Sequence, residues 1–194
     1  TRATLYGTRG PDLEKSIPNG LAFAENGDIL VANYGTSQFE IMRRNGETRV
    51  ICNSIDGHRL GEANFIYRDS HKRLWFTIAT MKQNWIDGLY PDGADGYVGL
   101  IDQKGIRIVA DGFCYTNEVR LDEKEEYLYV VETGRKCISR LRVQPDGSLN
   151  NREIFGPSDL GPAGFPDGIA FDVHGNLWGT CVWAEKIFAI TPEG

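Results

Sequence analysis

The chain repeats a unit of about fifty residues, and this repeat limits its fold more than any other feature of the sequence. Four segments of similar pattern read PNGLAFAENGDILVANY, ANFIYRDSHKRLWFTIA, TNEVRLDEKEEYLYVVE and PDGIAFDVHGNLWGTCV. The second residue of each segment is Asn or Asp, and these positions follow one another at steps of 45, 53 and 50 residues. A recurring unit of this length is typical of propellers and solenoids.

Each segment indicates two antiparallel strands joined by a turn, and two further short runs follow it. The third runs are QFEIMR, YVGLID, CISRLRV and KIFAIT, and the fourth runs are TRVIC, IRIVAD and LNNREIF. No long stripe of helical period interrupts the pattern. The 23 glycines agree with many tight turns. The sequence therefore predicts an all-β fold, a β-propeller built from four-stranded antiparallel blades.

We expect a single propeller domain over residues 1–194. Within it, the repeat places four blades at about 17–59, 60–112, 113–162 and 163–194, and residues 1–16 are expected to form the outer strand of an adjacent blade. The formal net charge is −6, so nucleic acid is not an expected partner, because binding phosphates requires a basic face. No apolar run reaches the roughly 18 residues of a membrane span, so no membrane partner is expected. Oligomeric state and location stay open, with a cytoplasmic location slightly favoured.

The repeated Asn and Asp positions are expected to meet at one mouth of the propeller channel. The innermost strand of each blade lines that channel, and Asn19, Asn64, Asn117 and Asp167 all stand at the start of such a strand. Oxygen-bearing side chains at one depth are suitable ligands for a hard cation. Asn and Asp are also good turn formers, which is the alternative reading of each position taken singly. Four such residues at the same offset favour a shared site.

The sequence resembles the senescence marker protein, gluconolactonase and luciferin-regenerating enzyme family of six-bladed propellers. The stretches YTNEVRLDEKEEYLYVVET and FPDGIAFDVHGNLW carry the resemblance, and NFIYRDSHKRLWFTIATM is similar to the preceding blade of that family. The resemblance covers most of the chain. It implies metal-dependent hydrolysis of a lactone, with a small-molecule lactone or sugar acid as the substrate. The implied cofactor is a divalent cation, calcium first, with zinc or magnesium as alternatives.

The resemblance also assigns roles to individual residues. It places Asn117 and Asp167 as metal ligands, makes Asp167 the catalytic residue, and makes Asn64 a substrate contact. We expect Asn19 to contact the substrate at the same mouth. Some members of the family carry Arg where this chain has Glu62, a departure that changes the substrate contact there and puts the substrate's identity in doubt.

The segment 81–96, MKQNWIDGLYPDGADG, is the one long insertion, and it joins the second and third strands of its blade. Such connections are expected on the same face as the Asn and Asp positions, because strand direction alternates. Long loops in compact domains are often functional. Trp85 and Tyr90 are therefore predicted to stack on a ring substrate, and the alternative is a self-packed surface loop.

The length of the chain leaves two architectures open. Six blades of this size need about 300 residues, and the chain has 194. In the family a third metal ligand, a Glu, belongs to the first blade, and by position it would lie upstream of Thr1. We therefore favour four blades of a six-bladed protein. The alternative is a closed four-bladed ring in which ATLYG completes the last blade.

The expected chemistry is attack of water on a lactone carbonyl. A cation at the carbonyl oxygen stabilises the developing charge, and Asp167 accepts the proton of the attacking water if it serves as the base. The chain has no Gly-x-Ser-x-Gly nucleophile motif and no glycine-rich phosphate loop. Two other functions stay open: a non-enzymatic propeller that binds a ligand or a protein, and an enzyme of the strictosidine-synthase type.

Overall fold

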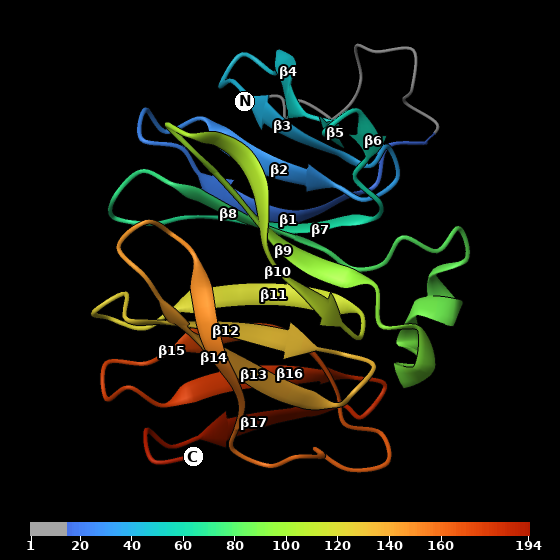
Figure 1. The fold of residues 1–194 in the computed structure, drawn as a ribbon, viewed down its shortest axis with the longest axis vertical. Helices are drawn as coiled ribbons and strands as arrows, with labels where there is room; N and C mark the ends of the chain where they lie inside the picture. Colours follow the sequence, from blue (N-terminus) through green and yellow to red (C-terminus); the bar gives the residue numbers. More distant parts are fainter. Residues whose placement is uncertain (1–14) are drawn as a thin grey trace.

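The computed structural model describes residues 15–194 and confirms the all-β propeller arrangement predicted from the repeat. Its strands form four blade sheets and one small hairpin, and the sheets run from β1–β4 at the top of Figure 1 to β15–β17 at the bottom. Nearly all of the outer strand expected for residues 1–16 lies outside the described residues. A total of six blades stays a prediction.

The first two blades are antiparallel sheets whose strands follow one another in chain order. The strands are β1 (Pro18–Phe23), β2 (Ile29–Asn33), β3 (Gln38–Met42), β4 (Thr48–Cys52), β7 (Ala63–Arg68), β8 (Leu74–Ile78), β9 (Gly96–Asp102) and β10 (Gly105–Phe113). Between them lies the hairpin of β5 (Ser54–Ile55) and β6 (His58–Arg59). The first blade thus holds β1–β4 and the second holds β7–β10.

The third and fourth blades continue the same order. Their strands are β11 (Thr116–Leu121), β12 (Tyr127–Glu132), β13 (Cys137–Val143), β14 (Leu149–Phe155), β15 (Phe165–Phe171), β16 (Leu177–Val182) and β17 (Lys186–Ile190). The connection between β8 and β9 holds two short 3-10 helices, η2 (Trp85–Leu89) and η3 (Pro91–Gly93). No helix in the part of the chain that the structure describes has the length and apolar character needed to cross a lipid bilayer.

The innermost strands of successive blades pack side by side. Contacts join β1 to β7, β7 to β11, and β11 to β15. Each of these strands is the first of its blade, so the chain enters every blade at the inside and leaves it at the outer edge. This arrangement brings the starts of the four inner strands to the same end of the assembly, which is the geometry expected of a propeller.

The pairing of each inner strand with its neighbour slips near its start. The register shifts lie between Pro18 and Leu21, Ala63 and Phe65, Thr116 and Val119, and Pro166 and Ile169. In every blade the slip contains the repeated Asn or Asp. A β-bulge of this kind turns a side chain out of the regular alternation, and bulges are common next to active sites. The bulges therefore give the four polar side chains a direction that a regular strand would not.

The turns after the inner strands share a second feature, an aspartate whose side chain accepts hydrogen bonds from within the turn. Asp69 accepts hydrogen bonds from the backbone N–H of Arg73 and from Nε1 of Trp75, both at 2.8 Å. Asp172 likewise accepts one from Nε1 of Trp178 at 2.9 Å. Because Asx turns of this type satisfy backbone groups locally, the Asp and Trp in these segments are explained by the turn and need no role in the site.

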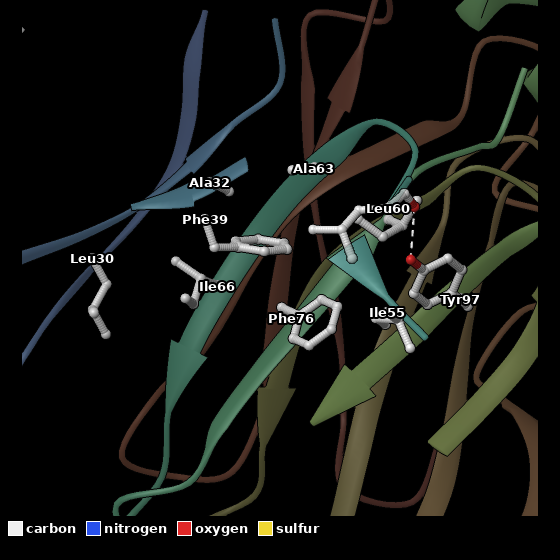
Figure 2. Packing of buried hydrophobic residues seen from close by; sticks show 10 residues of the cluster. Leu30, Ala32, Phe39, Ile55, Leu60, Ala63, Ile66, Phe76 and Tyr97 are labelled. Carbon is white, nitrogen blue, oxygen red and sulfur yellow. Dashed lines mark hydrogen bonds between the residues drawn. The ribbon is translucent and has the colours of Figure 1, made fainter. Parts of the chain in front are cut away.

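The core between the first two blades is dense and aromatic (Figure 2). The rings of Phe39 and Phe76 lie 4.7 Å apart between centroids, and both side chains are fully buried. Oη of Tyr97 donates a hydrogen bond to the carbonyl oxygen of Leu60 at 2.6 Å, which satisfies the polar end of a buried ring. Gly99 lies on β9 opposite Phe76, and the Phe76 ring covers its Cα.

We expect Gly99→Ala to lower the free energy of unfolding by about 1–3 kcal/mol, the usual cost of overpacking a core. An added Cβ would lie 2.0 Å from the Phe76 ring, and that ring is itself fully buried and packed against Phe39. Urea denaturation measures the loss. Gly93→Ala is the control, since its nearest neighbour is the flexible end of Lys82 at 3.3 Å. Equal stability of the two variants would contradict the prediction.

One carboxylate is buried in the third blade and is surrounded by donors. Glu132 is 1% exposed. It accepts hydrogen bonds from Oγ of Ser139 at 2.5 Å, Nη2 of Arg152 at 2.6 Å, Nη1 of Arg135 at 2.8 Å and the backbone N–H of Cys114 at 3.1 Å. A buried charge is tolerated when it is paired and hydrogen-bonded in this way. Glu132 thus ties the outer strands of its blade to the segment that leads into β11.

Candidate functional site

The repeated Asn and Asp residues line one cavity of about 270 Å³, called the mouth cavity below. Its full lining is Ile17, Asn19, Tyr34, Asn64, Trp85, Leu89, Tyr115, Asn117, Thr133, Asp167, Val182 and Trp183. Asn64 and Asn117 are 3% and 6% exposed and form its buried part, while Asn19 and Asp167 are exposed. The structure therefore brings together one polar side chain from each of the four blades.

A short hydrogen-bond chain orients Asn117. Its Nδ2 donates to Oγ1 of Thr133 at 3.1 Å, and this hydroxyl donates in turn to the carbonyl oxygen of Pro166 at 2.7 Å. The chain links the third blade to the fourth. Because the amide nitrogen of Asn117 donates to Thr133 and also to Asp167, the carbonyl oxygen of the same side chain is the end that is left to accept from, or coordinate, a ligand.

The bulge that carries Asp167 is supported from both sides. The backbone N–H of Gly168 donates to Oγ1 of Thr180 at 3.2 Å, and the N–H of Ile169 donates to Oε2 of Glu118 at 3.1 Å. Glu118 itself pairs with Arg120 at 3.1 Å. These bonds satisfy two backbone donors that the slipped register takes out of regular pairing, so the position of Asp167 is fixed by neighbouring side chains.

Burial dominates the electrostatic surroundings of the Asp167 carboxyl. The protein atoms around the carboxyl raise its pKa above the ordinary value by removing water, and a hydrogen bond from Asn117 acts in the opposite direction. No basic side chain among the described residues contributes to this balance. In the buried part of the cavity, Oδ1 of Asn64 has no hydrogen-bond partner in the described structure. Both groups are thus suited to a ligand that supplies positive charge or a donor.

Two predicted substrate contacts lie outside the mouth cavity. The carboxylate of Glu62 accepts a hydrogen bond from Nη2 of Arg59 at 3.0 Å and is not among the residues that line the cavity. Tyr90 is 63% exposed and does not line the cavity. It follows η2 in the chain, whereas Trp85 begins this helix and does line the cavity. The insertion therefore presents one of its two aromatic rings to the site.

Several lining residues were not predicted from the sequence. Tyr34 and Thr133 are the first residues after the second strands of their blades, a position that Trp183 shares. Tyr115 comes directly before an inner strand and has φ +56°, a backbone conformation that is uncommon outside glycine and is often found at functional sites. Their positions in the repeat could have indicated them. The second strand of a blade ends where the inner strand begins, so residues directly after a second strand lie close to the mouth.

Comparisons with known proteins agree with this fold. A gluconolactonase of Zymomonas mobilis subsp. mobilis is 27% identical over 202 residues, which cover 91% of this chain and 52% of that protein. A protein of Arabidopsis thaliana named strictosidine synthase-like 4 is 22% identical, and the alignment covers 83% of this chain and 43% of that protein. The chain thus spans about half the length of the curated relatives it matches.

Solved structures and a family-level match complete the comparison. A gluconolactonase from Xanthomonas campestris superposes with a TM-score of 0.71 at 21% identity, covering 91% of this chain and 63% of that one. At this identity the likeness shows the fold alone. Residues 4–194 match the family described as SMP-30/Gluconolactonase/LRE-like region. This match extends over nearly the whole chain, and the chain therefore belongs to the SMP-30/gluconolactonase/LRE-like family.

Proposed function

We propose that the full-length protein hydrolyses a lactone at the mouth cavity. The observation that carries the proposal is the placement of Asn19, Asn64, Asn117 and Asp167, one from each described blade, around one cavity. Membership of a family that includes gluconolactonases supports the general reaction. The substrate is then a small-molecule lactone, and the product is the corresponding hydroxy acid.

The side chains of the mouth cavity fit a divalent cation. Oδ1 of Asn64 is buried without a partner among the described residues, and the Asp167 carboxyl has no basic neighbour there. No group of three His, Cys, Asp or Glu side chains in the described part could hold a metal ion, so amide oxygens must contribute to any such site. We assign Asn117 and Asp167 as ligands. Amide and carboxylate oxygens suit calcium best, with magnesium or zinc as alternatives.

The reaction uses the carboxylate of Asp167 to accept a proton from water as the water oxygen attacks the lactone carbonyl carbon. The tetrahedral intermediate then collapses, the bond from the carbonyl carbon to the ring oxygen breaks, and the proton returns from Asp167 to that oxygen. When bound, the cation stabilises the negative charge that develops on the carbonyl oxygen. Asn64 and Asn19 orient the substrate through hydrogen bonds from their amide groups.

The proposed function is tested by following acid release from δ-lactones in a pH-stat with the purified full-length protein. Hydrolysis above the background rate, lost on chelation and restored by calcium, is the expected result. Turnover that continues unchanged in the presence of EDTA would contradict the metal assignment. A protein that binds calcium but hydrolyses no lactone would contradict the reaction and favour a binding propeller.

Calcium should stabilise the full-length protein, by about 2.7 kcal/mol when its concentration is 100 times the dissociation constant. Asn117→Ala should weaken calcium binding by at least about tenfold. Removing a residue that only supports a metal ligand already costs about 10- to 100-fold in affinity, and Asn117 is proposed as a ligand itself. Thermal unfolding with calcium or EDTA provides the measurement. Asn150→Ala, at an exposed position of β14, is the matched control and should retain the full calcium response. A melting temperature of the parent protein that is the same with calcium and with EDTA would contradict the assignment.

A further inference from the structure

The mouth cavity has an aromatic wall, which we define as Tyr34, Trp85, Tyr115 and Trp183. These four residues come from three blades and from the insertion between β8 and β9. The rings of Trp85 and Tyr115 meet edge to face with centroids 6.1 Å apart. Trp85 is 40% exposed and Trp183 is 63% exposed, so ring surface is available to a ligand. Leu89 and other aliphatic residues continue the lining beside this wall.

The helix η2, which carries Trp85, is held in place by contacts with the segments around it. Sγ of Cys114 contacts the carbonyl oxygen of Gly88 at 3.6 Å, which ties η2 to the segment before β11. The helix also lies so close to Gly134 that a Cβ there would be 2.5 Å from the carbonyl oxygen of Leu89. The side chain of Asn84 caps the start of η2 by accepting from the N–H of Ile86 at 3.3 Å. A surface ordered before binding loses little entropy when a ligand docks on it.

The wall offers few free polar groups and no positive charge. The hydroxyl groups of Tyr34 and Tyr115 hydrogen bond to each other at 3.2 Å. Among the described residues that line the mouth cavity, none is Lys, Arg or His. Arg59 does not line the cavity and is paired with Glu62 at 3.0 Å. Hydroxyl or phosphate groups on the part of a ligand that faces the rings would lack partners there, which is unfavourable, whereas the Asn and Asp side chains of the cavity can hydrogen bond the polar part.

We infer that the substrate is a small, uncharged lactone that carries a flat aromatic or apolar group, and that this group packs on the aromatic wall while the lactone carbonyl faces Asn117 and Asp167. This inference rests on the proposed function and names its substrate class. A cavity of about 270 Å³ suits a small ligand, since sites for drug-sized molecules are commonly larger, at about 300–1,000 Å³. Aromatic surfaces prefer flat apolar partners in offset or edge-to-face contact.

Three δ-lactones with the same six-membered ring separate the alternatives: dihydrocoumarin, δ-valerolactone and glucono-δ-lactone. The measurement is kcat/KM for the full-length protein, divided by the rate constant for hydroxide hydrolysis of each compound, because the aryl ester is intrinsically more reactive. We expect the normalised value for dihydrocoumarin to exceed both others by about tenfold or more, a factor in keeping with one well-packed aromatic contact. A normalised value for glucono-δ-lactone that equals or exceeds the value for dihydrocoumarin would overturn the inference but would still agree with the proposed function.

A variant pair locates the effect on the wall. Trp85→Ala should lower kcat/KM for dihydrocoumarin by about 5- to 10-fold and leave δ-valerolactone nearly unchanged. Trp85→Phe, which keeps a ring, should recover most of the loss and guards against a folding defect in the alanine variant. Ile86→Ala, in the same short helix but outside the lining, is the control and should leave both substrates unaffected. Equal losses on both lactones would overturn the inference, and failure of all three lactones to hydrolyse would overturn the proposed function together with it.

Discussion

Replacing Asp167 by Asn should lower kcat/KM for lactone hydrolysis by about 10²-fold or more, the usual scale for losing general acid–base catalysis. The substitution keeps the size of the side chain and much of its hydrogen bonding. It removes the one carboxylate among the side chains that line the mouth cavity in the described structure, and with it both the proposed base and a charged ligand for the cation. Steady-state kinetics with calcium present measures the change.

The fold should tolerate this substitution. Asn already occupies the matching bulge in the three other blades, at Asn19, Asn64 and Asn117. His174→Ala is the control and should leave activity near that of the parent. This residue is exposed in the turn at the far end of the same inner strand, and it bonds to Asp172 through its backbone N–H, which alanine keeps. Full turnover by Asp167→Asn on a lactone that the parent hydrolyses would show that Asp167 only shapes the strand entry.

Glu132→Ala should lower the free energy of unfolding by about 3–5 kcal/mol, the range for removing one partner of a buried ion pair. Four donors converge on this carboxylate, and two of them are guanidinium groups, from Arg135 and Arg152. The alanine leaves these groups and a buried N–H without their acceptor. Urea denaturation, read as the change in midpoint at constant slope, gives the loss.

The matched control for this prediction lies in the same blade. Glu153→Ala removes a carboxylate that pairs with Arg140 at 2.6 Å but is 53% exposed, so water screens the pair. Exposed pairs contribute about 0–1 kcal/mol. Comparable losses in the two glutamate variants would mean that the buried network around Glu132 is no stronger than a surface ion pair.

The contribution of Glu132 should also depend on pH. Burial by itself would raise the pKa of this carboxyl, but the hydrogen bonds from Ser139 and Arg152 outweigh it, and the net pKa lies below its ordinary value of 4.5. A pKa lowered by folding stabilises the protein above the ordinary value, and this stabilisation is lost as the pH falls through the lowered one. The difference in stability between the parent and Glu132→Ala should therefore narrow below about pH 4.5. A difference that widens there would contradict the assignment.

The fold was predictable because the residues that recur in the repeat form turns and strands through local interactions. Gly27 and Gly175, both with positive φ, mark turns between first and second strands, and the apolar runs around such turns specify strands without tertiary information. The same offsets placed Asn64, Asn117 and Asp167 at comparable positions. Their arrival in one cavity follows from the repeat, since identical units that pack side by side place identical positions together.

The rest of the site depends on tertiary contacts that leave no periodic signal. The bulges arise from how an inner strand pairs with its neighbour, which the alternation of residues alone does not specify. The orientation of η2 depends on its close packing against Gly134, a residue far away in the sequence. Composition likewise gave no sign that Glu62 would pair with Arg59. These contacts set which aromatic and acidic side chains line the mouth cavity.

The four bulges have a consequence for how this site can diverge. A bulged residue stands outside the regular ladder, so its side chain can change without breaking a backbone pair of the sheet that carries it. At the two exposed positions, Asn19 and Asp167, each exchange between Asn and Asp changes the charge at the mouth by one unit while keeping the shape of the side chain. These two exchanges alone take the mouth through three charge states on an unchanged frame, and carboxylates from different blades would repel one another there.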